Sequence, residues 1–244
     1  MAKAPRQPAR PWRSLARGAG LAACLWLAGQ GAAADILRAE YTDPTTRYAH
    51  GVLGDAIEYG ALELVLDDGT RLRAVLPEDL VFEDIAPRLA DLDGDGDAEV
   101  VTVEASQTGG GRLAIWDETG RIGATPHIGQ PNRWLAPVGA ADLDGDGAVE
   151  IAYVDRPHLA RVLRVWRFEG GALTEVAALE GFSNHRIGWD YIEGGIRECG
   201  DGPEMVLASG DWRRVMAVRF DGALSARALG DYSAAAVARA LACR

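Results

Sequence analysis

The chain has 244 residues, about half of them apolar, which suffices for one domain with a packed core and for two at most. It carries 25 Lys and Arg against 36 Asp and Glu; five of the basic residues and none of the acidic ones lie in positions 1–34, so the remainder has a net charge of about −16. Such a field repels nucleic acid and anionic lipid and suits bound cations, so we expect no nucleic-acid partner.

Residues 1–34 have the order of a secretory signal peptide. Basic residues come first, the short apolar run 21–27 follows, and Ala32-Ala33-Ala34 offers small residues for cleavage before Asp35. This run is shorter than the roughly 20 residues of a membrane-spanning helix, and no later segment is long and apolar enough, so no membrane span is expected. We therefore expect a periplasmic or secreted protein. Two alternatives stay open: a lipoprotein anchored at Cys24, where Leu21-Ala22-Ala23-Cys24 resembles a lipobox, and an uncleaved N-terminal anchor.

Residues 35–230 have the pattern of short strands joined by tight turns. Leu62 to Leu66 and Leu72 to Leu76 flank Asp67-Asp68-Gly69-Thr70, which indicates a hairpin because Asp-Gly tolerates the positive φ of a tight turn. No convincing helical period occurs before residue 230, so the sequence predicts an all-β domain. Further strands are expected at 99–104, 112–116, 149–154, 162–168, 204–208 and 215–220.

Two acidic segments of this domain are near copies of each other. The segment from Asp91 to Glu99 recurs 51 residues later as the segment from Asp142 to Glu150, a spacing within the range of propeller blades. A degraded copy follows at 199–206, and a fainter one precedes both at 54–58. The sequence therefore predicts four repeated units of three or four strands each.

Each acidic segment offers the oxygen ligands that calcium requires. Carboxylates stand at alternate positions, and glycines between them permit a sharp backbone path. An EF-hand is excluded, because its twelfth position must be Glu and is Thr102 or Tyr153 here. We predict two calcium ions. Their expected ligands are Asp91, Asp93, Asp95, the carbonyl of Asp97 and Glu99 in the first loop, and Asp142, Asp144, Asp146, the carbonyl of Ala148 and Glu150 in the second.

The motif Ala-Asp-Leu-Asp-Gly-Asp-Gly-x-x-Glu, followed by Val or Ile, resembles the FG-GAP and VCBS repeats and the calcium blades of integrin α-subunits. The resemblance covers about residues 45–225. It implies a small β-propeller of about four blades, with calcium in a strand–strand loop of each intact blade. Arg197 and Cys199 replace the first two acidic ligands in the third loop, so no calcium is expected there. The first unit has only Asp55 and Glu58 and is not expected to bind calcium tightly. Either the ring closes, or the tail or a partner covers its edge.

Residues 231–244 form a separate tail. Asp231-Tyr232-Ser233 can cap a short helix from Ala234 to Cys243, which is rich in helix-forming residues. Cys199 and Cys243 are the only cysteines after position 34, and in an oxidising compartment an even pair indicates one disulfide. That bond would hold the tail on the last unit; two separate thiols are the alternative.

Aromatic and cationic residues precede the repeated turns, and a propeller would bring equivalent positions to one face. The candidate ligand or partner surface comprises His50, Arg133, Trp134, His185 and Arg186, with Glu83 and Asp84 joining from the remaining unit. The alternative is that Trp134 and Trp189 pack between blades and the polar residues are solvated.

The sequence contains no Gly-x-Ser-x-Gly, P-loop or His-Glu-x-x-His motif. We therefore predict a binding module rather than an enzyme, with structural calcium and an unidentified protein or carbohydrate partner. The alternatives are a hydrolase or lyase with its site on the axial face, and a purely structural role.

Overall fold

The computed structural model describes residues 34–244; Cys24 and all but the last residue of the predicted signal peptide lie outside this range. Within it, seventeen strands and one short C-terminal helix make up the regular structure, so the all-β prediction is confirmed. In the same range, no helix has the length and apolarity needed to cross a membrane.

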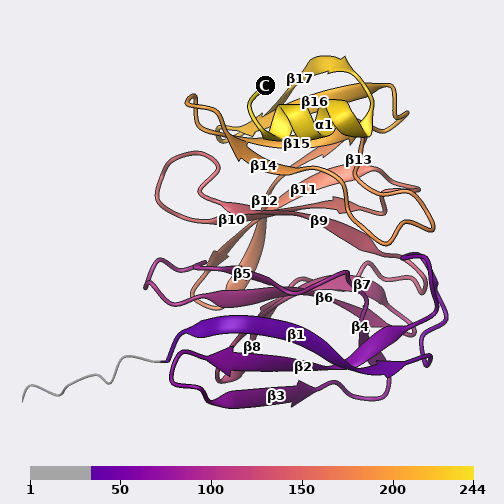
Figure 1. Ribbon diagram of the computed structural model, residues 1–244, viewed down its shortest axis with the longest axis vertical. Coiled ribbons are helices and arrows are strands. Elements are labelled where there is room, and N and C mark those ends of the chain that lie inside the picture. Colours follow the sequence, from indigo (N-terminus) through magenta and orange to yellow (C-terminus); the bar gives the residue numbers. More distant parts are fainter. Residues whose placement is uncertain (1–33) are drawn as a thin grey trace, which may run out of the picture. The chain divides into compact units, whose positions relative to one another are not determined.

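The strands form three antiparallel sheets (Figure 1). The first contains β1 (Ile36–Thr45), β2 (Glu58–Leu66), β3 (Arg71–Val75), β4 (Leu80–Phe82), β5 (Arg88–Ala90), β6 (Glu99–Ser106), β7 (Gly110–Asp117) and β8 (Gly120–Ala124). The second contains β9 (Leu135–Ala141), β10 (Glu150–Asp155), β11 (Val162–Glu169) and β12 (Ala172–Glu180). The third contains β13 (Phe182–Ser183), β14 (Gly195–Glu198), β15 (Pro203–Ser209), β16 (Arg214–Phe220) and β17 (Leu224–Asp231).

Three of the four sequence units are four-stranded meanders: β5–β8, β9–β12 and β14–β17. In each, the loop between the first two strands is the repeated segment, and the glutamate near the start of the second strand pairs with a residue near the end of the first strand. These pairs are Ala90 with Glu99, Ala141 with Glu150, and Arg197 with Glu204. The repeat therefore places its acidic loops at the same end of successive units.

A closed four-bladed propeller, which the resemblance implied, is not found in the described part of the chain. The short strand β4 pairs with both β2 and β6, so the first two units merge into one sheet. The three sheets then follow one another in chain order, with the first and third at opposite ends of the series (Figure 1). The first unit has only the meander β1–β3, and its segment 54–58 leads into β2 without forming an acidic loop.

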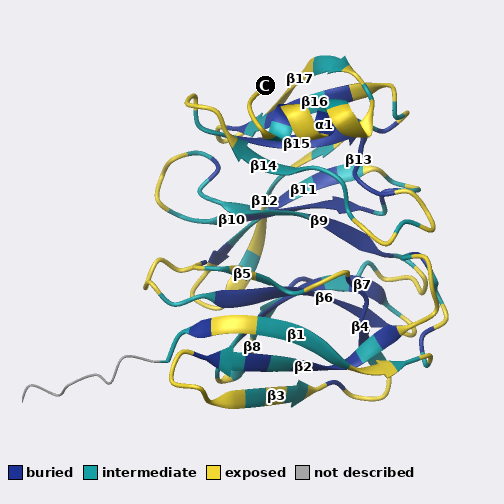
Figure 2. Ribbon diagram, in the orientation of Figure 1, coloured by how far each residue is buried: buried dark blue, intermediate teal, exposed yellow. Residues whose placement is uncertain are grey.

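Apolar residues fill the space between consecutive sheets. The strands β6 and β10 are buried along their whole length, whereas β12 is largely exposed (Figure 2). One cluster joins β6 and β7 to β9–β11, and a second joins the second sheet to the third. Because both faces of these central strands are covered, the polar residues Thr102 and Glu104 of β6 are buried together with its valines.

The tail forms the predicted helix on the last sheet, but this helix is shorter than predicted. The helix α1 spans Ala234–Leu241 and ends two residues before the predicted Cys243. Ser233 caps it, since its hydroxyl accepts a hydrogen bond from the Ala236 amide at 3.1 Å. The predicted Cys199–Cys243 disulfide is present and fastens the end of α1 beside β14.

Candidate functional site

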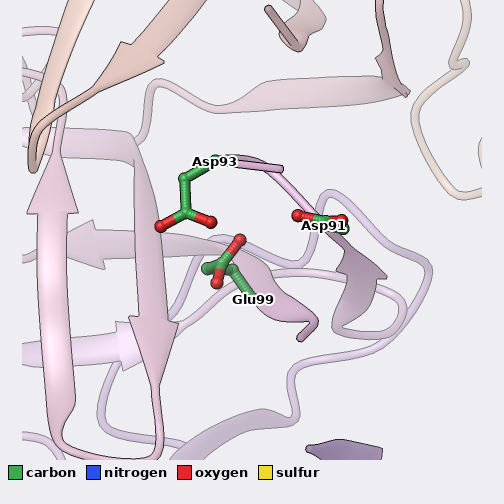
Figure 3. Close-up of side chains that lie close together, drawn as sticks. All are labelled: Asp91, Asp93 and Glu99. Atoms are coloured by element: carbon green, nitrogen blue, oxygen red, sulfur yellow. The ribbon is translucent and has the colours of Figure 1, made fainter. Parts of the chain in front are cut away.

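The first acidic loop is held by hydrogen bonds from its own backbone to its carboxylates. Asp91 accepts from the Gly94 amide at 2.7 Å and from the Gly96 amide at 3.2 Å, while Glu99 accepts from the Leu92 amide at 2.7 Å. Gly94 and Gly96 have φ values of 79° and 98°, which L side chains rarely adopt. Oxygen atoms of Asp91, Asp93 and Glu99 thereby lie within 4.8 Å of one another, with Asp93 and Glu99 facing each other (Figure 3).

The second loop repeats this geometry. Asp142 accepts from the Gly145 amide at 2.7 Å and from the Gly147 amide at 3.0 Å, and Glu150 accepts from the Leu143 amide at 2.9 Å. Here the clustered oxygens belong to Asp142, Asp144 and Asp146. Two segments with the same backbone path and the same internal bonds present carboxylates in a way that suits a divalent cation.

An arginine distinguishes the second loop from the first. Arg167 on β11 pairs in register with Glu150, donates to it at 2.7 Å, and also contacts Asp144 at 3.1 Å and Asp146 at 2.9 Å. In the first loop the register of β6 and β7 places Asp117 at the corresponding position. The first loop therefore lacks the positive charge that Arg167 brings to the second.

The pKa values of the two glutamates reflect this difference. Burial and the neighbouring carboxylates of the loop aspartates raise the pKa of Glu99 to about 7. The hydrogen bond from the Leu92 amide lowers this pKa but does not offset the rise. Burial also raises the pKa of Glu150, but Arg167 opposes the rise. Without a cation, the first loop is thus the more unfavourable concentration of negative charge.

Not all expected ligands join the two clusters. The side chain of Asp95 instead accepts from the Asp97 amide at 2.9 Å, and Glu150 is engaged by Arg167. The clusters are defined by side-chain atoms, so the carbonyls of Asp97 and Ala148 stay predictions as ligands. In the third loop, Glu204 accepts from Arg197 at 2.6 Å and from Arg227 at 2.8 Å, so two guanidinium groups neutralise it.

A cavity of about 340 Å³ lies at the other end of the same strands. Glu150 begins β10 at the acidic loop, and Asp155 ends it next to the cavity. The lining residues are His50, Val52, Asn132, Arg133, Trp134, Arg156, His158, Leu159 and Ile187. Three of them, His50, Arg133 and Trp134, belong to the surface expected from the sequence.

The other members of that expected surface lie elsewhere. His185 is fully buried behind the cavity, its ring 4.9 Å from that of Trp134. Arg186 does not line the cavity; its guanidinium lies over Trp212, 4.3 Å from the ring centre. The structure therefore does not bring Arg186 together with the cavity residues, because its side chain packs on the aromatic residue Trp212 instead.

Of the two acidic residues expected beside this surface, one contacts the cavity wall and the other pairs elsewhere. Glu83 is buried and bonds to Nδ1 of His50, and its backbone carbonyl accepts from the Trp134 indole at 2.7 Å. The second carboxylate oxygen of Glu83 has no partner among residues 34–244. Asp84 instead binds Arg88 at 2.6 Å.

In one wall of the cavity, the hydrogen bond between two histidines determines which of their ring nitrogens carry a hydrogen. His185 Nε2 lies 3.0 Å from the Trp189 carbonyl and must donate to it, and burial lowers the pKa of His185, which leaves its Nδ1 as an acceptor. His158 Nε2, 2.9 Å from that Nδ1, must therefore be the donor. Burial and the neighbouring His185 lower the pKa of His158 to about 4, so His158 is neutral and its Nδ1 carries a lone pair.

This pair predicts a pH dependence of stability. The folded-state pKa of His158 lies below the unfolded value near 6.5, so the folded form binds fewer protons, and its contribution is lost as pH falls from about 6.5 toward 4. We expect the free energy of unfolding to fall between pH 7 and pH 5 through this residue, because the unfolded chain gains the proton first. Urea unfolding at both pH values would measure it. His158→Gln should lose this part of the pH dependence; an identical pH dependence in the variant would contradict the assignment.

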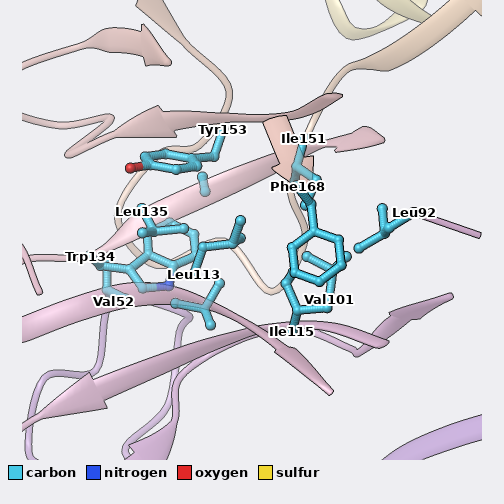
Figure 4. Close-up of a cluster of buried hydrophobic side chains, with 12 residues drawn as sticks. Val52, Leu92, Val101, Leu113, Ile115, Trp134, Leu135, Ile151, Tyr153 and Phe168 are labelled. Carbon is cyan, nitrogen blue, oxygen red and sulfur yellow. The ribbon is translucent and has the colours of Figure 1, made fainter. Parts of the chain in front are cut away.

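One apolar cluster connects the first acidic loop with the cavity (Figure 4). Leu92, inside that loop, belongs to the same cluster as Val52 and Trp134 in the cavity wall. In the view of Figure 4, Val52 and Trp134 lie at one end and Leu92 and Phe168 at the other. Packing of the loop can therefore influence the cavity wall through contiguous side chains.

Sequence reasoning missed several residues of these sites. Arg167 and Arg227 lie on strands that pair next to the loops, so only the strand register brings them there. Arg156 and His158 follow β10 directly, at the end opposite its acidic loop. Because they follow the acidic loop by the length of one strand, the sequence did indicate that they lie at the opposite end of that strand.

Comparison with known proteins identifies part of this chain. Residues 91–153, which hold both acidic loops, match the family model of the FG-GAP-like repeat, which confirms the resemblance to FG-GAP repeats over these residues. No curated protein matches the sequence.

Two solved structures are similar to the chain. One is the exotype rhamnogalacturonan lyase YesX, with 20% identity and a TM-score of 0.47 over 76% of this chain and 40% of that one. Another is a Bacillus licheniformis rhamnogalacturonan lyase PL11, with 12% identity and a TM-score of 0.41 over 80% of this chain and 51% of that one. The chain thus spans about half the length of these structures or less.

Proposed function

We propose that this protein is an exported, calcium-stabilised binding module, built of four blade-like units in which two acidic loops hold calcium and the cavity at the opposite loop end receives the ligand. The FG-GAP-like repeat over residues 91–153 favours an interaction module. The Cys199–Cys243 disulfide favours a compartment outside the reducing cytosol.

The observation that carries the calcium proposal is the shared geometry of the two loops. Both close through the same three amide bonds to an aspartate and a glutamate, and both gather three carboxylates within 4.8 Å. Like charges at this separation repel, and a hard divalent cation with oxygen ligands relieves that repulsion.

The two loops should differ in affinity. A cation entering the second loop competes with Arg167, which already contacts Glu150, Asp144 and Asp146. No arginine of the described residues contacts Asp91, Asp93 or Glu99, so the first loop has no internal cation to displace. We infer that the first loop binds calcium more tightly.

Calorimetry on chelator-stripped protein tests this order. We expect uptake of two calcium ions with dissociation constants at least ~10-fold apart, a difference of about 1.4 kcal/mol. Asp93→Asn should remove the tighter event and Asp144→Asn the weaker one. Arg167→Gln should strengthen the weaker event. The absence of any heat, or loss of the weaker event in Asp93→Asn, would refute the assignment.

A catalytic role is the second candidate, and the buried Glu83 bonded to His50 at the cavity favours it. A carboxylate that orients a histidine is a common acid–base arrangement. A carbohydrate-cleaving hydrolase or lyase would release new reducing ends from a polysaccharide, and His50→Ala would abolish that release. A binding module would release none.

A further inference from the structure

We propose that the cavity between His50 and Ile187 binds a small hydroxy acid, with its carboxylate on Arg133 and a hydroxyl group on Nδ1 of His158. This inference rests on the proposed binding role and adds the chemical class of the ligand. It depends on three properties of the cavity wall. The wall contains a guanidinium that forms no ion pair, a histidine nitrogen that can only accept a hydrogen bond, and apolar side chains at the opening.

The guanidinium of Arg133 has unused donors. Its Nη1 donates to the Asn132 carbonyl at 2.9 Å, and no carboxylate of residues 34–244 forms an ion pair with it. Most arginines of this acidic protein are paired, Arg156 with Asp155 at 2.8 Å being the example in the same wall. A half-buried guanidinium with free, coplanar N–H groups matches a carboxylate in charge and in geometry.

Arg156 adds to the positive potential although it is paired. Asp155 receives a second guanidinium, because Arg164 donates to it at 3.1 Å. Arg156 has a φ of 46°, which residues other than glycine, asparagine and aspartate rarely adopt. Such backbone conformations are costly and concentrate at functional sites.

His158 accepts a hydrogen bond rather than donating one. Its Nε2 hydrogen is directed at Nδ1 of His185, 2.9 Å away, which leaves Nδ1 of the neutral His158 as an acceptor. A neutral imidazole so arranged needs a donor from the ligand, which a carboxylate alone does not supply. A hydroxyl group close to the carboxylate satisfies both side chains.

The remaining wall is apolar and open to solvent. Leu159 and Ile187 line the cavity and are 63% and 72% exposed, and Val52 lies behind them. The volume of about 340 Å³ is within the range of small-molecule pockets. A compact ligand with C–H faces, such as a sugar acid, would cover these exposed side chains.

Chemical-shift titration of the ¹⁵N-labelled, calcium-loaded protein tests the proposal with three probes. D-Glucuronate carries both groups, D-glucose lacks the carboxylate, and hexanoate lacks the hydroxyl. We expect saturable shifts at the Trp134 indole and the Arg133 amide with glucuronate, and at least ~10-fold weaker binding of the other two. Arg133→Gln should weaken glucuronate binding by a similar factor. Arg38→Gln, which removes an equal charge from an exposed pair with Glu40, should not.

Equal binding of glucose and glucuronate to the wild-type protein would overturn the carboxylate assignment, whether or not Arg133→Gln folds. Equal binding of hexanoate would overturn the hydroxyl assignment. No saturable shift at the cavity with millimolar glucuronate would overturn the whole inference. If the protein takes up calcium but does not bind glucuronate, only the inference about the ligand fails and the calcium proposal is unaffected. If it binds glucuronate but takes up no calcium, only the calcium proposal is refuted.

Discussion

Removal of calcium should lower the melting temperature by roughly 5–10 °C. An ion that binds only the folded state stabilises it by about 2.7 kcal/mol when its concentration is 100 times the dissociation constant. In a domain of this size, 1 kcal/mol corresponds to roughly 2–4 °C. Differential scanning calorimetry of stripped protein, with and without millimolar calcium, measures the shift.

Most of this stabilisation should come from the first loop. Asp91, Asp93 and Glu99 have no internal cation, and Leu92 ties their loop to the apolar cluster between the first two sheets. Asp93→Asn should therefore remove most of the calcium-dependent shift. Asp201→Asn, in the third loop, is the matched control, because two arginines already neutralise Glu204 there. A calcium shift of full size in Asp93→Asn would contradict this distribution.

The acidic loops were predictable because their information is local. Alternating aspartates, glycines between them and a following apolar strand all lie within nine residues, and the glycines do adopt the positive φ that the turn requires. The hairpin at Asp67–Thr70 was predictable for the same reason: the Leu66 amide donates to the Thr70 carbonyl at 2.9 Å. The identity of the ion itself stays a prediction.

Features set by distant parts of the chain could not be predicted. Arg167 reaches the second loop only because β10 and β11 pair Glu150 with it. The merging of the first two units depends on Phe82, which pairs β4 with Tyr59 on β2 and with Glu104 on β6. The repeat pattern specifies each meander but carries no signal for how many meanders close into a ring.

Removal of the disulfide should detach the C-terminal helix and leave the sheets folded. Cys199 and Cys243 are 44 residues apart in the sequence, and their bond holds the end of α1 beside β14. The helix α1 has eight residues, too few to be stable alone, and buries only Val237 and Ala240. Without the crosslink its packing on Val206 and Val215 must hold it unaided.

Hydrogen exchange on the double variant Cys199→Ser, Cys243→Ser measures this effect. Amides of α1 should lose protection by two orders of magnitude or more, since each 1.4 kcal/mol corresponds to a factor of about ten. Amides of β6 and β10 should keep theirs, because these strands are buried by neighbouring sheets and not by the tail. Reduced wild-type protein is the control and should match the variant. Loss of protection throughout the sheets would show instead that the crosslink stabilises the whole domain, and unchanged protection of α1 would show that its apolar contacts suffice.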